Sequence, residues 1–147
     1  MMFGEEIENE IKEFINKIGN IHYHSDSNYG VEYLNNNFRF LGTKIDLSKE
    51  KNYVSYDFKK NNFLDMIKFF EFKDIKENIL ASNEIHYVGD GITNSELVFS
   101  GKEFFKLLEF LFVNVPEHHY FFDMEKKWCL FIATEGWIAY GEKSIER

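Results

Sequence analysis

Four of the five histidines in this chain of 147 residues occur as two close pairs, and imidazole is the commonest metal ligand among side chains. His22 and His24 are two residues apart, so both would lie on one face of a β-strand and could bind one ion. His118 and His119 are adjacent and would face opposite sides of a strand. No H-E-x-x-H or C-x-x-C motif and no Asp-rich loop accompanies either pair. We therefore expect surface or packed histidines and no metal site.

Carboxylates could also perform acid–base chemistry, and Glu135 is the most distinctive of them. It directly precedes Gly136 and Trp137, so it could line a pocket beside an aromatic strand. It could equally be the turn residue of a hairpin that joins Leu130–Thr134 to Trp137–Tyr140, and we favour the turn. Most other acidic residues fall on the expected solvent faces of helices or in turns.

Other signatures of catalysis are weak or missing. The single cysteine, Cys129, follows Trp128 in a strand pattern, where a buried thiol behaves as a small apolar side chain. No G-x-S-x-G motif is present, and the pair Gly89 and Gly91 lacks the third glycine or the following lysine of a phosphate-binding loop. The sequence therefore indicates no catalytic residue and no cofactor, and it favours a protein that is not an enzyme.

Aromatic residues gather between His118 and Glu142, where both tryptophans, Trp128 and Trp137, occur. They could form a binding surface, but aromatic residues make up 18% of the whole chain, including 17 phenylalanines. Phenylalanine then replaces leucine and valine as a core residue, and we favour this interpretation for most of them. Trp128, Glu135 and Trp137 remain the candidates for binding a partner or ligand.

Three helical regions are expected to position these residues. Apolar residues from Ile7 to Ile18 follow one helical stripe, which Gly19 and Asn20 end. Residues 62–81 continue a helical pattern that loses phase near Phe72, as in a kinked helix or two short ones.

The third helix is expected from Gly101 to about Phe112. Ser100 and Glu103 form an S-x-x-E capping box at its beginning, and Pro116 lies beyond its end. Because it is apolar nearly all round, we expect this helix to be largely buried.

Short extended patterns separate these helices. Val31–Leu34 and Phe38–Leu41 flank three asparagines and predict a hairpin, while residues 46–52 predict a loop. Further strands are expected at 53–58, 84–88 and 96–99, followed by those of the aromatic region. This order favours a single α+β domain over residues 1–147, with a mainly antiparallel sheet, about three helices and a C-terminal β-meander.

The formal net charge of −8 restricts the classes of partner. An acidic surface repels phosphates and anionic lipids, so we expect neither nucleic acid nor membrane as a partner. A basic protein partner would be attracted. The N-terminal residues lack the basic flank and apolar run of an export signal, no apolar stretch is long enough to span a membrane, and one cysteine suits a reducing compartment. We expect a cytoplasmic location; the oligomeric state stays open.

The aromatic strand Tyr120–Asp123, Trp128 at the start of the next strand, and the Glu135-Gly136-Trp137 turn carry a resemblance. In these features the chain resembles the small acidic α+β immunity-type proteins that bacteria encode beside polymorphic toxins. The resemblance implies stoichiometric binding, in which acidic and aromatic residues meet a basic face of the toxin. It points to no named immunity family and assigns no functional residue.

Two hypotheses follow for the function. The first is a non-catalytic cytoplasmic protein-binding domain, of which an immunity-type inhibitor is one form. The alternative is a small-molecule-binding domain or minor enzyme, whose aromatic-lined pocket would be flanked by Trp128 or Trp137 with a polar group such as Glu135. A self-assembling structural protein is a third option and would rest on exposed aromatic area alone.

Overall fold

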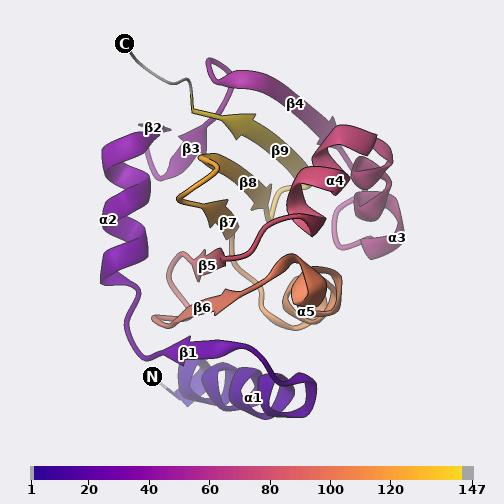
Figure 1. Cartoon of the computed structure of the whole chain (residues 1–147). Helices are drawn as coiled ribbons and strands as arrows, with labels where there is room; N and C mark the ends of the chain where they lie inside the picture. The colour runs from indigo at the N-terminus through magenta and orange to yellow at the C-terminus, as the bar shows by residue number, and fades with distance from the viewer. Residues whose placement is uncertain (1, 144–147) are drawn as a thin grey trace.

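The computed structural model describes residues 2–143, and its centre is a seven-stranded sheet whose neighbouring strands are all antiparallel (Figure 1). The strand order is β1-β6-β5-β7-β8-β9-β4. The bounds are β1 His22–His24, β4 Lys51–Asp57, β5 Ile85–Gly89, β6 Glu96–Phe99, β7 His119–Asp123, β8 Trp128–Ala133 and β9 Trp137–Glu142. Strands β7, β8 and β9 are successive neighbours, which confirms the predicted C-terminal meander.

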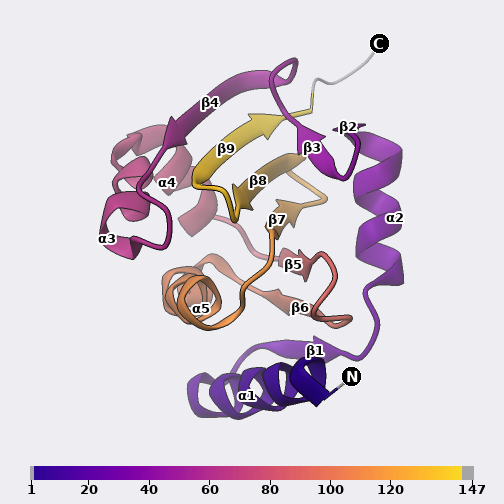
Figure 2. The ribbon, with the colours of Figure 1, turned by 180° about the vertical axis from the view of Figure 1, so that it is seen from behind.

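Helices cover both faces of this sheet, as Figures 1 and 2 show from opposite sides. Within residues 2–143 they are α1 Met2–Ile18, α2 Asn28–Asn37, α3 Phe63–Met66, α4 Lys73–Leu80 and α5 Gly101–Asn114, with a short 3₁₀ helix η1 at Ile67–Glu71. The predicted α+β class is confirmed, although the helices outnumber the three that were expected. In this part of the chain, no helix combines the length and the apolar character needed to cross a membrane.

The first helix ends where its sequence predicts. Ile7, Ile11 and Ile15 form its buried stripe. Gly19 and Asn20 then adopt positive φ angles of 78° and 62°, a left-handed conformation that glycine and asparagine tolerate best. This reversal turns the chain into β1 at the edge of the sheet.

The other two predicted helical regions are also confirmed. The break near Phe72 is real, because this residue has an extended ψ of 101° and separates η1 from α4. The Ser100–Glu103 capping box is formed at the beginning of α5. Most of the inward side of α5 is buried, but Val113 near its end is exposed, so the helix is less enclosed than its composition suggests.

The hairpin predicted from Val31–Leu34 and Phe38–Leu41 is wrong, because most of this segment is helix α2. Gly30, Leu34 and Phe38 are spaced by four residues, and their burial against the sheet outweighs the turn preference of the asparagines between them. The actual hairpin follows, as β2 Arg39–Leu41 paired with β3 Lys44–Asp46. Strand β3 ends at Asp46 and β4 begins at Lys51, so the loop predicted at 46–52 is limited to residues 47–50.

The two faces of the sheet carry two separate cores. We call the larger one the main core; it lies between the sheet and helices α1, α3, α4 and α5 and contains Phe121, Trp128, Leu130 and Tyr140 among others. The second core lies under α2 and the β2–β3 hairpin. Its buried members are Leu34, Phe38, Ile45, Leu47, Val88, Tyr120, Phe122, Cys129, Phe131, Ala133 and Ala139.

Candidate functional site

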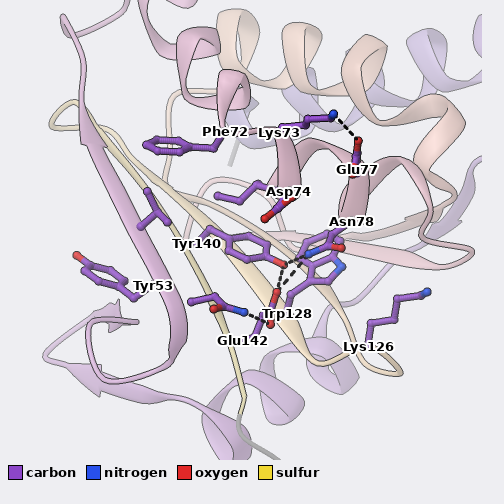
Figure 3. A pocket seen from close by; sticks show the side chains of 13 residues that line it. Tyr53, Phe72, Lys73, Asp74, Glu77, Asn78, Lys126, Trp128, Tyr140 and Glu142 are labelled. Carbon is purple, nitrogen blue, oxygen red and sulfur yellow. Dashed lines mark hydrogen bonds and ion pairs between the residues drawn. The ribbon is translucent and has the colours of Figure 1, made fainter.

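A cleft of about 700 Å³ opens between helix α4 and the sheet, over the paired strands β4 and β9 and the beginning of β8 (Figure 3). Its walls come from β4, the beginning of α4, the turn before β8, and β9. We call it the Glu142 cleft after the carboxylate within it. The lining side chains used below are Asn52, Tyr53, Phe72, Lys73, Asp74, Glu77, Asn78, Lys126, Trp128, Tyr140 and Glu142.

The Glu142 carboxylate is held by three neutral donors. The Tyr140 hydroxyl donates to Oε2 at 2.7 Å, and Asn78 Nδ2 donates to the same oxygen at 3.2 Å. Asn52 Nδ2 donates to Oε1 at 2.9 Å from across the β4–β9 pair. Figure 3 shows the side chains of Tyr140 and Asn78 converging on Glu142. Among residues 2–143 no lysine, arginine or histidine forms an ion pair with Glu142, so the carboxylate is oriented but not neutralised.

The tyrosine in this group is a donor at any physiological pH. Burial, followed by the hydrogen bond to Glu142, raises the pKa of Tyr140 above its usual value of 10. Asn78 Nδ2 also donates to the Tyr140 hydroxyl at 3.1 Å, which fixes the phenol from a second side. The three side chains therefore form one rigid polar group.

Strand pairing explains why these residues meet. In the β8–β9 hairpin Trp128 lies opposite Glu142, and Leu130 lies opposite Tyr140. Residues two apart in a strand share a face, so Tyr140 and Glu142 both point toward α4. The Trp128 and Tyr140 rings are 6.0 Å apart.

Trp128 contributes an unusual donor to the wall of the cleft. The side chain is only 1% exposed, yet among residues 2–143 its indole Nε1 has no hydrogen-bond partner. A buried polar group left unpaired costs about 1–3 kcal/mol. The nitrogen is enclosed by the protein itself, so a ligand in the cleft does not reach it.

The rim of the cleft is aromatic and charged. Phe72 before α4 is 47% exposed, and Tyr53 on β4 is 40% exposed with its ring pointing away from Glu142 (Figure 3). Lys73 and Glu77 form a loose ion pair at 4.0 Å on the outer side of α4. The side chain of Asp74 points back toward the cleft (Figure 3).

The structure does not bring the three candidate residues from the sequence together. Only Trp128 lines the Glu142 cleft. Trp137 is half-buried on the opposite face, where its ring packs edge-to-face on Phe131 at 5.0 Å. Glu135 is in the exposed β8–β9 turn, as the turn interpretation predicts, and its carboxylate pairs with Lys44 Nζ at 2.8 Å. That contact lowers the pKa of Glu135.

The paired histidines are also separated. His22 and His24 are exposed on the edge strand β1. His118 lies 4.0 Å from both Asp90 and Glu135 at the surface, whereas His119 is buried in the sheet. In the part of the chain that the structure describes, no group of three or more His, Cys, Asp and Glu side chains is arranged to hold a metal ion.

His86, which sequence reasoning did not single out, lies in a buried polar cluster under α2. Its Nδ1 is 2.5 Å from Glu96 Oε2, and its Nε2 is 2.8 Å from Glu84 Oε2. Burial lowers the pKa of His86, but the two carboxylates outweigh this and raise it above its usual value. Glu96 Oε1 also accepts from the backbone N–H of Gly30 at 3.1 Å. The cluster therefore attaches α2 to the sheet.

Other buried polar groups also have structural partners. Burial raises the pKa of Cys129, so its thiol stays protonated, and burial lowers the pKa of His119 to about 3, so its ring stays neutral. The Tyr87 hydroxyl, 2.7 Å from His119 Nδ1, can then donate to that nitrogen. The buried Glu117 carboxylate accepts from the backbone N–H groups of Ile92 and Thr93. None of these groups is exposed for reaction with a substrate.

Comparison of the chain with protein-family models, curated proteins and solved structures finds no match. The chemistry of the Glu142 cleft is therefore inferred from its own residues.

Proposed function

We propose that this chain is a non-catalytic, cytoplasmic protein-binding domain for a basic protein partner, as an immunity-type inhibitor of a toxin would be. The observation that carries the proposal is the Glu142 cleft. It holds a carboxylate that three neutral donors orient and that no cation among residues 2–143 neutralises. Exposed aromatic rings stand beside it, on a chain whose net charge is −8.

Two physical effects would act in succession on such a partner. The net negative charge would attract a basic surface over long range and raise the association rate. Tyr53 and Phe72 would then supply apolar contact area at the rim, since aromatic residues provide much of the binding energy in protein interfaces.

The buried titratable groups support a binding role over catalysis. The thiol of Cys129 is buried and protonated, and the His119 ring is buried and neutral. His86 and Glu96 hold α2 in place and are almost fully enclosed. A nucleophile or general base would need access to a substrate, which these groups lack.

Co-expression with the products of the neighbouring genes tests this proposal. We expect one of them to be a basic protein that forms a stoichiometric complex with this chain and is inhibited by it. Because the attraction is electrostatic, the association rate should fall as salt rises and the Debye length shrinks from about 10 Å to about 3 Å. If no neighbouring product binds or is inhibited, the proposal is wrong.

The alternative, a small-molecule-binding domain, is favoured by two properties of the same cleft. Its volume of about 700 Å³ matches small-molecule sites, and the Glu142 carboxylate, oriented by neutral donors, offers a specific acceptor. A screen of cationic metabolites by thermal unfolding separates the two functions. A saturable rise in Tm with one metabolite, together with no protein complex, would favour the alternative.

A further inference from the structure

We propose that helix α2 is a pH-sensitive lid over the second core. The protonated His86 ring holds the lid closed by neutralising the buried Glu96 carboxylate, and loss of that proton releases the beginning of the helix. The lid lies on the opposite face of the sheet from the Glu142 cleft, as the separate positions of α2 and α4 in Figure 1 show. It is a conformational property of the chain that does not depend on the proposed function.

The contact between α2 and the sheet depends on one carboxylate. Glu96 is only 3% exposed. Its Oε1 accepts from the backbone N–H of Gly30, in the first turn of α2, at 3.1 Å, while its Oε2 lies 2.5 Å from His86 Nδ1. A buried carboxylate that loses its counter-charge carries a large desolvation cost. The carboxylate that holds α2 is therefore stable as an anion only while the His86 ring is positively charged.

The surroundings of His86 favour the charged ring. Its second nitrogen, Nε2, is 2.8 Å from Glu84 Oε2, so a carboxylate lies at each ring nitrogen. A protonated imidazole donates through both nitrogens, whereas a neutral ring donates through only one. Burial lowers the pKa of His86, but the two carboxylates outweigh this and raise the pKa above its usual value. The closed lid therefore binds the proton more tightly than the open one.

Two more titratable side chains approach this cluster from the edge strand β1. In the ladder His24 lies opposite Glu96, and His22 lies opposite Val98, the residue that pairs with His86. Residues opposite one another in a sheet share a face, so both β1 histidines are on the His86 side of the sheet. Both are already exposed with α2 closed, so opening changes their surroundings little. His24, opposite Glu96, is therefore the matched control for His86.

The groups that β7 and α2 present to the ring are uncharged. Phe122 on β7 stacks on the imidazole of His86 with ring centres 5.4 Å apart, and Tyr33 on α2 stacks on Phe122 at 5.4 Å. Burial raises the pKa of Tyr33 to about 12, so its phenol stays neutral. The acidic side chains of this segment, Asp26 and Glu32, are exposed. Near neutral pH, His86 is therefore the group whose titration changes the charge beneath α2.

Cys129 reports whether α2 is closed. It is the single cysteine of the chain and is fully buried in the second core. In the β7–β8 ladder it lies opposite Phe122, on which Tyr33 of α2 stacks. Opening of α2 would withdraw Tyr33 and admit a small thiol reagent. The probe is iodoacetamide, and the labelling rate is divided by that of the urea-unfolded chain at the same pH, which corrects for the reactivity of the thiolate.

The corrected labelling rate should rise with pH and then become constant. Because the closed state binds the His86 proton more tightly, raising the pH favours opening by at most about tenfold for each pH unit. The rise should begin near the usual histidine pKa of about 6.5 and end at the pKa of the closed state. A corrected rate that stays constant between about pH 6 and about pH 9 would overturn the inference.

Three substitutions test whether His86 controls the rise. His86→Gln has no titrating ring, so its corrected rate should be independent of pH and close to the high-pH rate of the unchanged chain. Glu84→Gln removes one carboxylate whose side chain is 66% exposed, so this variant should fold normally and its rise should end at lower pH. His24→Gln should keep the rise of the unchanged chain. A rise that persists in His86→Gln, stays in place in Glu84→Gln or disappears in His24→Gln would mean that another group controls the lid, and the inference would fail.

A main-core variant separates opening of α2 from unfolding of the whole chain. Ile11 of α1 is fully buried in the main core, so Ile11→Val should lower global stability. Labelling through the lid should be unchanged in this variant, because local opening leaves the main core folded. A labelling rate that rises in proportion to the loss of global stability would show that Cys129 is reached by global unfolding, and α2 would not be a separate lid.

Discussion

The two faces of the sheet are built differently, although the same strands supply both. The main core is covered by four helices and holds the larger set of buried apolar side chains, together with the buried Tyr87–His119 pair. The second core is covered only by α2 and the β2–β3 hairpin, and a buried histidine–glutamate cluster attaches α2 at one end. The difference indicates that the main core supplies most of the stability, whereas the second core depends on specific polar contacts.

Truncating a ring in each core should give the largest difference. Phe121 is fully buried in the main core, within 5.1 Å of the Tyr87 and Phe104 rings. Phe121→Ala should lower the free energy of unfolding by about 3–5 kcal/mol. Phe40→Ala, in the partly exposed hairpin over the second core, should cost about 1–2 kcal/mol. Urea unfolding measures both, and equal losses would contradict the proposed ranking of the cores.

The attachment of α2 should be sensitive to a single methyl group. A Cβ on Gly30 would lie 2.7 Å from Glu96 Oε1 and 3.1 Å from the Phe122 ring. Gly30→Ala should therefore displace the helix and cost about 1–3 kcal/mol, despite the better helix propensity of alanine. The control is Asn36→Ala on the exposed side of α2, which should be neutral or slightly stabilising. Thermal unfolding that ranks the two variants equally would show that Gly30 is not a close contact.

The two buried histidines should have opposite effects on the pH dependence of stability. His119, whose pKa falls to about 3, favours folding when neutral, so its contribution is lost as pH falls below its usual pKa of 6.5. His86 has a raised pKa, so its contribution is complete below pH 6.5 and is lost as pH rises through the folded-state pKa. Each slope should be at most about 1.4 kcal/mol per pH unit.

Urea unfolding across this pH range, with the variants His119→Gln and His86→Gln, separates the two contributions. The first substitution should flatten the loss of stability on the acidic side, and the second should flatten the loss on the basic side. A change of slope on the same side for both variants would contradict the assigned protonation states.

The smallest effect is expected at the β8–β9 turn. Glu135→Gln removes an ion pair with Lys44 whose partners are both substantially exposed, so it should cost less than about 1 kcal/mol. Because Glu135 lies outside the Glu142 cleft, the variant should also leave binding of the basic partner unchanged. Loss of binding in Glu135→Gln would show that the binding site includes this turn.

Much of the fold could be predicted because local patterns and final contacts agree. The apolar stripe of α1, the capping box of α5 and the alternation in the terminal strands each correspond to one observed element. The prediction was wrong for the α2 segment because the buried face of this helix is short. Its burial depends on contacts with the distant residues Phe122 and Glu96. Its asparagine run is a genuine turn signal that tertiary packing overrides.

The candidate site was only partly predictable. Trp128 was identified, but it was grouped with Trp137 because both lie in one stretch of the sequence, and strand alternation places the two rings on opposite faces. Glu142 could have been found, because a hairpin centred on Glu135 places Glu142 opposite Trp128. Asn52 and Asn78 could not, since their approach depends on the pairing of β4 with β9 and on the docking of α4.

The strand order also determines when the molecule can acquire its cleft during synthesis. Both edge strands, β1 and β4, come early in the chain, but their partners β6 and β9 are synthesised much later. Asn52 must wait for Glu142, 90 residues further on, before its hydrogen bond can form. Such distant pairing slows folding and leaves β4 without a partner on the nascent chain. The Glu142 cleft is therefore among the last parts to form, and a chain that ends before β9 cannot complete it.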